Sequence, residues 1–438
     1  NWWEIGRHGD IELSARHLAW WAGGLLQSAL TATGRLIRPR FGEIADGRFS
    51  IIGLGKLGGA ELNLGSDVDL LFIWDAPTGA RSTGGRRDMD AREYYQYFSR
   101  LLIRLLSEHT ADGMTWLVDM RLRPGGDGAP VCMNLDATLD YYRDYGQTWE
   151  RAMLLKARPV AGDAGLGRRF LDGIAPFVYR RYLDYTTVQS LADMKRRIDA
   201  RGGEDEPAAG FDVKRGHGGI REIEFFVQSL QLLHGGRNET LRVQPCMAAL
   251  AALVSAGIVA AEDAAHLCDA YWFWRRIEHA LQARNGEHTH ALPADYTDYL
   301  GAALGLANPD RAMREQAAFV HGCFSTQFAD FEPDRDEREG WLEPEESTLA
   351  ARLDGMDEAG RQRVATALQR IATLLRRALL PERAHAQIDH ILARAMKSWL
   401  GDANGVQALE YFAELLQNIS GRATWVDLLA GNRGVLNW

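Results

Sequence analysis

Cysteine is scarce in this sequence, and its placement excludes two classes of site. The 438 residues contain four cysteines, which stand far apart and in none of the short spacings that ligate metal: Cys132, Cys246, Cys268 and Cys323. Such a set excludes a disulfide framework and a cysteine-based zinc site. We therefore expect buried free thiols in a reducing cytoplasm.

Long apolar runs are also missing. None reaches the roughly 18 residues that a membrane span requires. The opening residues, NWWEIGRHGD, have neither the basic region nor the apolar region of a signal peptide. We expect a cytoplasmic protein without membrane contact. Because the chain starts with Asn1 rather than methionine, we expect a fragment or a processed form.

Positive charge is not in excess, which argues against a nucleic-acid partner. The formal net charge is −9, and residues 330–346 alone hold nine acids against two arginines. Because this segment carries −7, the rest of the chain is close to neutral and offers no general basic face. We predict a solvated acidic linker at 330–346. No Ser-His-Asp or Cys-His arrangement for covalent catalysis is visible.

What the sequence does contain is a glycine-rich stretch between two predicted strands, FSIIGLGKLGGAELNLGSDVDLLFIW at 49–74. Asp67 and Asp69 stand two apart at the start of the second strand, so their side chains point to one face. Two carboxylates there repel each other without a cation, and Mg²⁺ takes carboxylate and phosphate oxygens. The glycine loop, with Gly55 and Lys56, offers backbone N–H groups and a positive charge for phosphate.

Two other interpretations compete for this stretch. Residues 53–58 fit the dinucleotide fingerprint G-x-G-x-x-G, but only about six residues separate Gly58 from Gly65. A dinucleotide-binding unit needs a full crossover helix at that point. Alternatively, each aspartate could cap a helix or a turn. That explains Asp67 well and Asp69 poorly, because aspartate is a poor strand former.

A second strand is predicted at 114–124, MTWLVDMRLRP, where apolar and polar residues alternate before Pro124. One face would carry Asp119, Arg121 and Arg123 in a row. Such a face could hold a metal ion and grip phosphate oxygens. The alternative is a surface ladder of ion pairs. We favour the functional interpretation, because the opposite face is wholly apolar and is expected to be buried.

Helices are expected over most of the remaining chain. Residues 10–37 show helical spacing up to Arg38 and Pro39, and residues 135–158 look helical. On the second, Lys156 could reach a phosphate or lie on a solvated edge. A further helix is expected over 220–234, entered by glycines together with Lys214, Arg215 and His217, which would make a second anion-binding end.

Four blocks together carry a family resemblance: GLGKLGGAELNLGSDVDLLF, VDMRLRP, TWERAMLLKAR and KRGHGGIREIEFFVQSLQLLHGG. They resemble glutamine synthetase adenylyltransferase, also called the adenylyl-transferring/adenylyl-removing enzyme. That family belongs to the polymerase-beta-like nucleotidyltransferases, marked by Gly-Ser followed by Asp-x-Asp. The resemblance covers roughly residues 50–290.

The resemblance implies a set of roles for individual residues. It makes Asp119 the third metal-binding carboxylate beside Asp67 and Asp69, with two Mg²⁺ ions as cofactors. The residues expected to contact phosphate or nucleotide are Gly55, Lys56, Ser66, Arg121, Arg123 and Lys156.

The resemblance also implies an activity. In full-length members of the family, the amino-terminal half is an adenylyl removase, which uses orthophosphate to release ADP from adenylylated glutamine synthetase. The carboxy-terminal half transfers AMP from ATP. The wording IREIEFFVQ, GGRNETLR and RRIEHALQ resembles the amino-terminal half, so removal of AMP is the first hypothesis and transfer the second. A regulatory scaffold that binds glutamine synthetase and a PII signal protein is the third.

The fold class expected is α+β: a polymerase-beta-like nucleotidyltransferase sheet with surrounding helices and further all-helical domains. The expected divisions are an amino-terminal helical segment at 1–47, a catalytic domain at 48–160, a helical domain closing the cleft at 161–329, the acidic linker at 330–346, and a helical unit at 347–438 leading to a missing second half.

Overall fold

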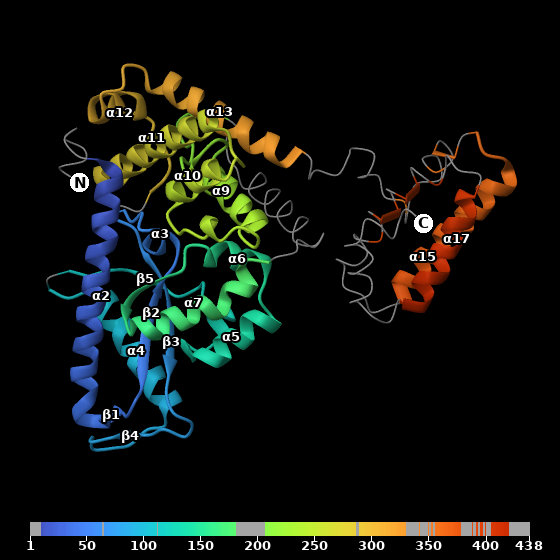
Figure 1. Cartoon of the computed structure of the whole chain (residues 1–438). Coiled ribbons are helices and arrows are strands. Elements are labelled where there is room, and N and C mark those ends of the chain that lie inside the picture. Colours follow the sequence, from blue (N-terminus) through green and yellow to red (C-terminus); the bar gives the residue numbers. More distant parts are fainter. Residues whose placement is uncertain are drawn as a thin grey trace. The chain divides into compact units, whose positions relative to one another are not determined.

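The computed structural model describes most of the chain (Figure 1). The described residues are 10–63, 65–111, 113–180, 206–285 and 289–329, followed by 341, 349, 352–353, 355–377, 388, 391–392, 395–396, 399 and 404–419. Contacts divide the molecule into two compact units, Asn1–Tyr182 with Met194–Gln327, and Leu183–Asp193 with Phe328–Trp438.

A small mixed sheet lies at the centre of the first unit. Its strand order is β5-β3-β2-β7, and β6 also pairs with β3. The strands are β2 (Arg48–Gly53), β3 (Val68–Asp75), β5 (Val118–Asp119), β6 (Cys132–Asn134) and β7 (Arg158–Gly162). Strand β2 runs antiparallel to both β3 and β7, whereas β5 and β6 run parallel to β3. The antiparallel β2–β3 pair excludes a dinucleotide-binding crossover, which joins parallel strands.

Helices cover both faces of this sheet, which explains why β2 and β3 are apolar almost throughout. On one face pack α2 (Ile11–Phe41) and α4 (Ala91–Ser107), which share a hydrophobic core with Ile51 and Phe72. On the other side α7 (Ala164–Val178) packs against β2, β3 and β7, and α5 (Leu135–Asp144) packs on α7. Figure 1 shows α2 running alongside the sheet.

Short elements connect these layers. Between β2 and β3 lies α3 (Gly55–Gly58), a single helical turn. Strands β1 (Glu43–Ile44) and β4 (Ser82–Thr83) form a separate two-stranded sheet, so part of the polar 76–91 segment is held in place. The remaining connectors are η1 (Gly126–Gly128) and α6 (Thr148–Leu154).

A helical bundle with its own hydrophobic core completes the first unit. It contains α9 (Ile220–His234), η2 (Glu239–Leu241), α10 (Cys246–Ser255), α11 (Ala261–Asn285), α12 (Tyr296–Leu304) and α13 (Pro309–Ala329). Trp274 and Tyr271 of α11 are fully buried at its centre. The bounds of α9 are those expected from its apolar stripe.

The second unit is helical where the structure describes it. Helices α15 (Glu358–Arg377) and α17 (Gly405–Ile419) pack against each other around Leu368, Ile371 and Phe412. The expected acidic linker at 330–346 lies outside the described residues, apart from Trp341. Among the helices described here, none combines the length and the apolar character that crossing a membrane requires.

The expected α+β class is confirmed, but three local expectations are wrong. Helix α2 continues through Pro39 to Phe41, because a proline in the last turn leaves the preceding bonds intact and Gly42 then ends the helix. The expected helix at 135–158 breaks after Asp144, and a capping box of Gln147 and Glu150 starts α6. Its last residue, Arg158, begins β7 instead.

Two of the proposed domain boundaries cut through the sheet layer. Helix α2, assigned to the segment 1–47, shares the core of β2 and β3. Strand β7 extends past residue 160, and α7 beyond it packs on the sheet. The sheet layer therefore extends from Ile11 to Val178, and the helical bundle begins after it.

The tight turn of α3 generates a stability prediction. A Cβ at Gly58 would lie 2.0 Å from the carbonyl oxygen of Lys156 and 2.6 Å from that of Gly53. Both are backbone atoms and cannot rotate away, so Gly58→Ala should lower the free energy of unfolding by about 1–3 kcal/mol or more. Chemical denaturation measures this.

The matched control is Gly34→Ala in α2, where an added Cβ meets no atom within 4 Å. Alanine loses less chain entropy than glycine in a helix, so this variant should be more stable by about 0.5–1 kcal/mol. Equal stability of the two variants would contradict the close packing at Gly58.

Candidate active site

Three carboxylates gather at one edge of the sheet. Asp67 directly precedes β3, Asp69 is its second residue, and Asp119 ends β5. The parallel register pairs Asp69 with Asp119, so their side chains lie next to each other on one face. Asp67 and Asp119 both repel the charge on Asp69. The structure thus brings together the three aspartates singled out in the sequence.

Asp69 is the carboxylate most affected by this crowding. Burial raises the pKa of Asp69 to about 6, and repulsion from Asp67 and Asp119 adds to the effect. Lys214 and Arg121 act in the opposite direction without cancelling it. A carboxyl group with these neighbours loses its proton more readily when a cation binds beside it.

The glycine loop packs closely against Asp69. Gly55 has a φ of +49°, and a Cβ at this position would lie 2.3 Å from Oδ2 of Asp69. The backbone N–H of the adjacent Leu54 donates to the carbonyl oxygen of Asp69 at 2.9 Å. Only glycine fits both the conformation and the contact, so the position of Gly55 is explained by its closeness to this carboxylate.

A buried indole joins the two strands that carry the aspartates. Nε1 of Trp116 donates to the carbonyl oxygen of Ser66 at 2.6 Å, and the N–H of Val68 donates to the carbonyl oxygen of Leu117 at 2.9 Å. Ser66 itself is buried. The segment before Asp119 is thereby fixed to the segment before Asp69.

Arg121 binds Asp119 rather than standing apart from it. Its Nε donates to both carboxylate oxygens of Asp119, at 3.1 and 2.8 Å, and Nη2 also donates to Oδ2. These bonds lower the pKa of Asp119. The Arg121 side chain is 74% exposed, so it is free to move toward another anion if a metal ion takes its place at Asp119.

The strand expected at 114–124 is wrong except for β5, Val118–Asp119: residues 114–117 before it and the residues after Asp119 are not in a strand. The strand ends there, and the chain turns through bonds from the N–H of Arg123 to Met120 O and from that of Gly126 to Arg123 O. The Arg123 guanidinium closes this turn by donating to the carbonyl oxygens of Met120 and Asp127, at 2.8 and 3.1 Å. Arg123 is therefore held by its own loop and not aligned with Arg121.

The two lysines that were expected to contact phosphate, Lys56 and Lys156, are held in buried ion pairs. Nζ of Lys56 lies 2.6 Å from Oε1 of Glu278, and burial lowers the pKa of Lys56 to about 8. Nζ of Lys156 lies 2.9 Å from Glu61 and 2.7 Å from Glu224. Lys156 is 5% exposed, so the alternative of a solvated edge is wrong, and the phosphate contact stays a prediction.

Lys156 and Glu224 shift each other's pKa so that both stay charged. Burial alone would raise the pKa of Glu224, but Lys156, with help from Lys214 and Lys56, lowers it to about 2. The pKa of Lys156 is correspondingly raised by Glu224 and Glu61 against the effect of burial. This cluster is a structural ion pair network between the end of α6, the glycine loop and α9.

Lys214 is the cation that the sequence analysis did not place at the site. It stands in the loop before α9 and acts electrostatically on Asp69, Lys56 and Glu224, so it contributes positive charge to the environment of the site. The sequence signal was its glycine-rich block, which indicated only a general anion-binding end. Its approach to Asp69 depends on how the helical bundle packs on the sheet.

The arrangement fits a divalent cation. The carboxylates of Asp67, Asp69 and Asp119 are hard oxygen ligands of the kind that Mg²⁺ prefers, and one of them is buried with a raised pKa. Gly55 leaves open the space next to Oδ2 of Asp69 that a side chain would fill. With Arg121 and Lys214 nearby, the site can hold both a metal ion and a phosphate group.

Comparisons with known proteins point to one family. The family model for glutamate-ammonia ligase adenylyltransferase matches residues 1–173, and that for GlnD PII-uridylyltransferase matches residues 189–327. The first match contains the three aspartates, and the second contains Lys214 and the helical bundle.

Curated relatives carry the name bifunctional glutamine synthetase adenylyltransferase/adenylyl-removing enzyme. One from Stenotrophomonas maltophilia is 44% identical over 310 residues, covering 69% of this chain and 33% of the relative. One from Xanthomonas axonopodis pv. citri is 45% identical over 286 residues, covering 64% and 30%. One from Pseudomonas putida is 33% identical over 466 residues, covering 99% and 46%. The chain thus spans less than half the length of these relatives.

The raised pKa of Asp69 predicts that removing its charge by mutation increases the free energy of unfolding, by an amount that depends on pH. Its charged form is disfavoured in the folded chain, so the free energy of unfolding should fall as pH rises from about 4, the unfolded pKa, to about 6. Without divalent cations at pH 8, Asp69→Asn should therefore be more stable by up to about 2–3 kcal/mol, with no gain below about pH 4. Chemical denaturation at several pH values measures this.

Added Mg²⁺ should stabilise the unaltered chain and not Asp69→Asn. The control is Asp75→Asn at the other end of β3, where Asp75 pairs with Arg169. This variant should keep the gain from Mg²⁺. Equal gains for all three proteins would place the cation elsewhere.

The two lysines near Glu224 should respond differently to replacement. Lys156→Met leaves Glu61 and Glu224 without their buried counterion and should cost about 3–5 kcal/mol of stability. Lys214→Met should change stability by less than about 1 kcal/mol while weakening phosphate binding. Denaturation and calorimetry measure the two effects. A large stability loss in Lys214→Met would make it a structural residue as well.

Proposed function

The chain belongs to the glutamate-ammonia ligase adenylyltransferase family, and on this premise we propose that it removes AMP from an adenylylated tyrosine of glutamine synthetase. The reaction is a phosphorolysis with orthophosphate as acceptor and ADP as product. Mg²⁺ is the cofactor and the adenylylated synthetase is the substrate. The observation that carries the proposal is that Asp67 and Asp119 converge on the buried carboxyl group of Asp69.

The chemistry is an in-line displacement at phosphorus. An oxygen of orthophosphate attacks the phosphorus of the tyrosyl-AMP, the bond from phosphorus to the tyrosine oxygen breaks, and that oxygen takes up a proton. Bound Mg²⁺ would neutralise charge on the attacking and leaving oxygens. Asp67, Asp69 and Asp119 are the residues that would hold it, and the protein's share is positioning and electrostatics rather than covalent catalysis.

The cationic residues of the site would hold the phosphates. Lys214 acts electrostatically on Asp69 in the structure, and Arg121 lies on Asp119 with a largely exposed side chain. Once a cation neutralises Asp119, the Arg121 guanidinium is released for a bidentate contact with phosphate oxygens. Gly55 keeps the loop close to Asp69, and Ser66 stays a predicted phosphate contact on the neighbouring turn.

The direction of the reaction is proposed from three sequence motifs. The blocks IREIEFFVQ, GGRNETLR and RRIEHALQ resemble the amino-terminal, AMP-removing half of the family. The metal site serves either direction, because both are nucleotidyl transfers between phosphate and tyrosine oxygens. Transfer of AMP from ATP to the synthetase is therefore the second candidate.

A regulatory scaffold is the third candidate, favoured by one comparison. Residues 189–327 match a family described as PII-uridylyltransferase, which makes a PII signal protein a proposed partner for the helical bundle. The converging aspartates weigh against a purely scaffolding role. Mg²⁺-dependent nucleotide binding, measured by calorimetry, would be absent from a scaffold.

The proposal predicts ADP release. The chain is incubated with adenylylated glutamine synthetase, orthophosphate and Mg²⁺, and ADP is measured by chromatography. We expect ADP to form only when all three are present, because orthophosphate is the attacking group. Asp67→Ala and Asp69→Ala should abolish turnover with an intact fold, since each removes a proposed metal ligand.

Asp75→Ala is the matched control for this assay. It removes a carboxylate from the same strand at the end where Asp75 pairs with Arg169, and it should turn over normally. No ADP from the unaltered chain, together with AMP transfer from ATP, would reverse the direction. Near-normal turnover by either of the other two variants would remove that aspartate from the site.

A further inference from the structure

A second polar cluster lies in the helical bundle, at the start of α9. It consists of His217 in the loop before α9, Glu222 in the first turn of α9, and His321 on α13. One ligand atom from each residue can be chosen so that all three atoms lie within 4.8 Å of one another. None of these residues has a role in the proposed AMP removal.

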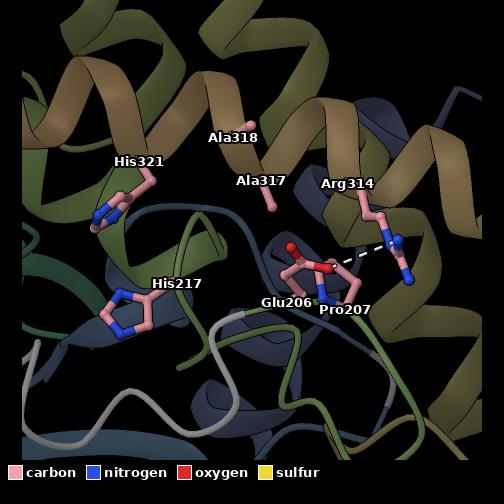
Figure 2. A pocket seen from close by; sticks show the side chains of 7 residues that line it. All are labelled: Glu206, Pro207, His217, Arg314, Ala317, Ala318 and His321. Atoms are coloured by element: carbon pink, nitrogen blue, oxygen red, sulfur yellow. Dashed lines mark ion pairs between the residues drawn. The ribbon is translucent and has the colours of Figure 1, made fainter.

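The cluster borders a pocket of about 360 Å³, which is also lined by Glu206, Pro207, Arg314, Ala317 and Ala318. Figure 2 shows the imidazole of His321 extending from α13 toward that of His217, with Arg314 farther along the same helix and paired with Glu206. The ring centroids of the two histidines are 5.0 Å apart, and the rings are nearly perpendicular. Both imidazoles can therefore be reached from the pocket.

The separations between the polar atoms fit a metal-binding site. Nδ1 of His321 lies 3.2 and 3.1 Å from the two oxygens of Glu222, and Nδ1 of His217 lies 3.5 Å from Oε1. In a tetrahedral zinc site with bonds of about 2.0–2.2 Å, neighbouring ligand atoms are about 3.3–3.5 Å apart. Because the three ligand atoms all lie within 4.8 Å of one another, side-chain rotation could bring all three residues to one ion.

Further contacts orient the would-be ligands. Glu222 is 2% exposed, and the backbone N–H of Gly218 donates to its carboxylate. Nε2 of His321 lies 3.3 Å from the Oγ of Ser325. A bond between these two atoms leaves Nδ1 as the coordinating nitrogen, directed at Glu222. Metal-binding histidines and carboxylates are commonly held in this way by a second set of polar groups.

The simpler explanation of Glu222 is that it serves its own helix. A carboxylate in the first turn of α9 interacts favourably with the helix dipole, and it can pair with one protonated histidine. That account needs neither the second imidazole nor the pocket beside it. Two imidazole nitrogens from separate segments facing one buried carboxylate form the donor set of two histidines and one acid that binds zinc.

We propose that His217, Glu222 and His321 bind one divalent transition-metal ion, with Zn²⁺ as the best match to the donor set. Imidazole nitrogens favour Zn²⁺ and its neighbours over Mg²⁺, which separates this site from the three aspartates. An ion held there would lie beside the pocket, because both histidines line it. Binding would link α13 to the loop before α9, the loop that also carries Lys214 toward Asp69.

The test is a calorimetric titration of the full chain with Zn²⁺, after chelator treatment and in excess Mg²⁺ to occupy the aspartates. We expect one Zn²⁺ per chain with micromolar or tighter affinity. His321→Ala and Glu222→Gln should each weaken binding by at least about tenfold. The His321 side chain is 42% exposed, so its removal should leave the fold intact, which circular dichroism checks.

His234→Ala supplies the matched control, because His234 lies exposed at the far end of α9. It should bind Zn²⁺ like the unaltered chain. If Glu222→Gln unfolds, His321→Ala alone decides. The proposal is overturned if the unaltered chain binds no Zn²⁺, or if His321→Ala binds it as tightly as His234→Ala does.

Discussion

A network of buried charges joins the glycine loop to the helical bundle, and the arrangement of the candidate site depends on it. Glu278 of α11 is fully buried and forms ion pairs with Lys56 through one carboxylate oxygen and with Arg275 through the other. Arg275 in turn donates to the carbonyl oxygen of Glu61, and Lys156 connects Glu61 with Glu224 of α9. Buried charges are costly unless every partner is present, so the network permits one relative position of sheet and bundle.

This constraint reaches the aspartates through the backbone. The loop that carries Lys56 also carries Gly55, where a Cβ would lie 2.3 Å from Oδ2 of Asp69, so the anchoring of Lys56 sets how closely the loop approaches. The helix that carries Glu224 is preceded by the loop of Lys214, a cation that acts electrostatically on Asp69. The electrostatic environment of Asp69 is thus set jointly by residues more than 140 positions apart in the sequence.

Local patterns predicted much of the fold, and long-range pairing explains what they missed. The strands at 49–52 and 68–74 and the helix at 220–234 follow from apolar periodicity, and the strand pattern also placed Asp67 and Asp69 on one face. Lys56 and Lys156 resembled phosphate ligands because their partners, Glu278 and Glu224, stand far away in sequence. The alternation at 114–124 failed because carbonyl groups of its own turn hold Arg123.

The same buried charges decide how the protein can be divided. A fragment ending near residue 180 would contain the whole sheet and all three aspartates, and would look complete. It would also carry Lys56, Lys156 and Glu61 at a newly exposed surface, without Glu278, Arg275 and Glu224 opposite them. The sheet layer is therefore not an independent folding unit, and dissection should keep the sheet layer and the helical bundle together.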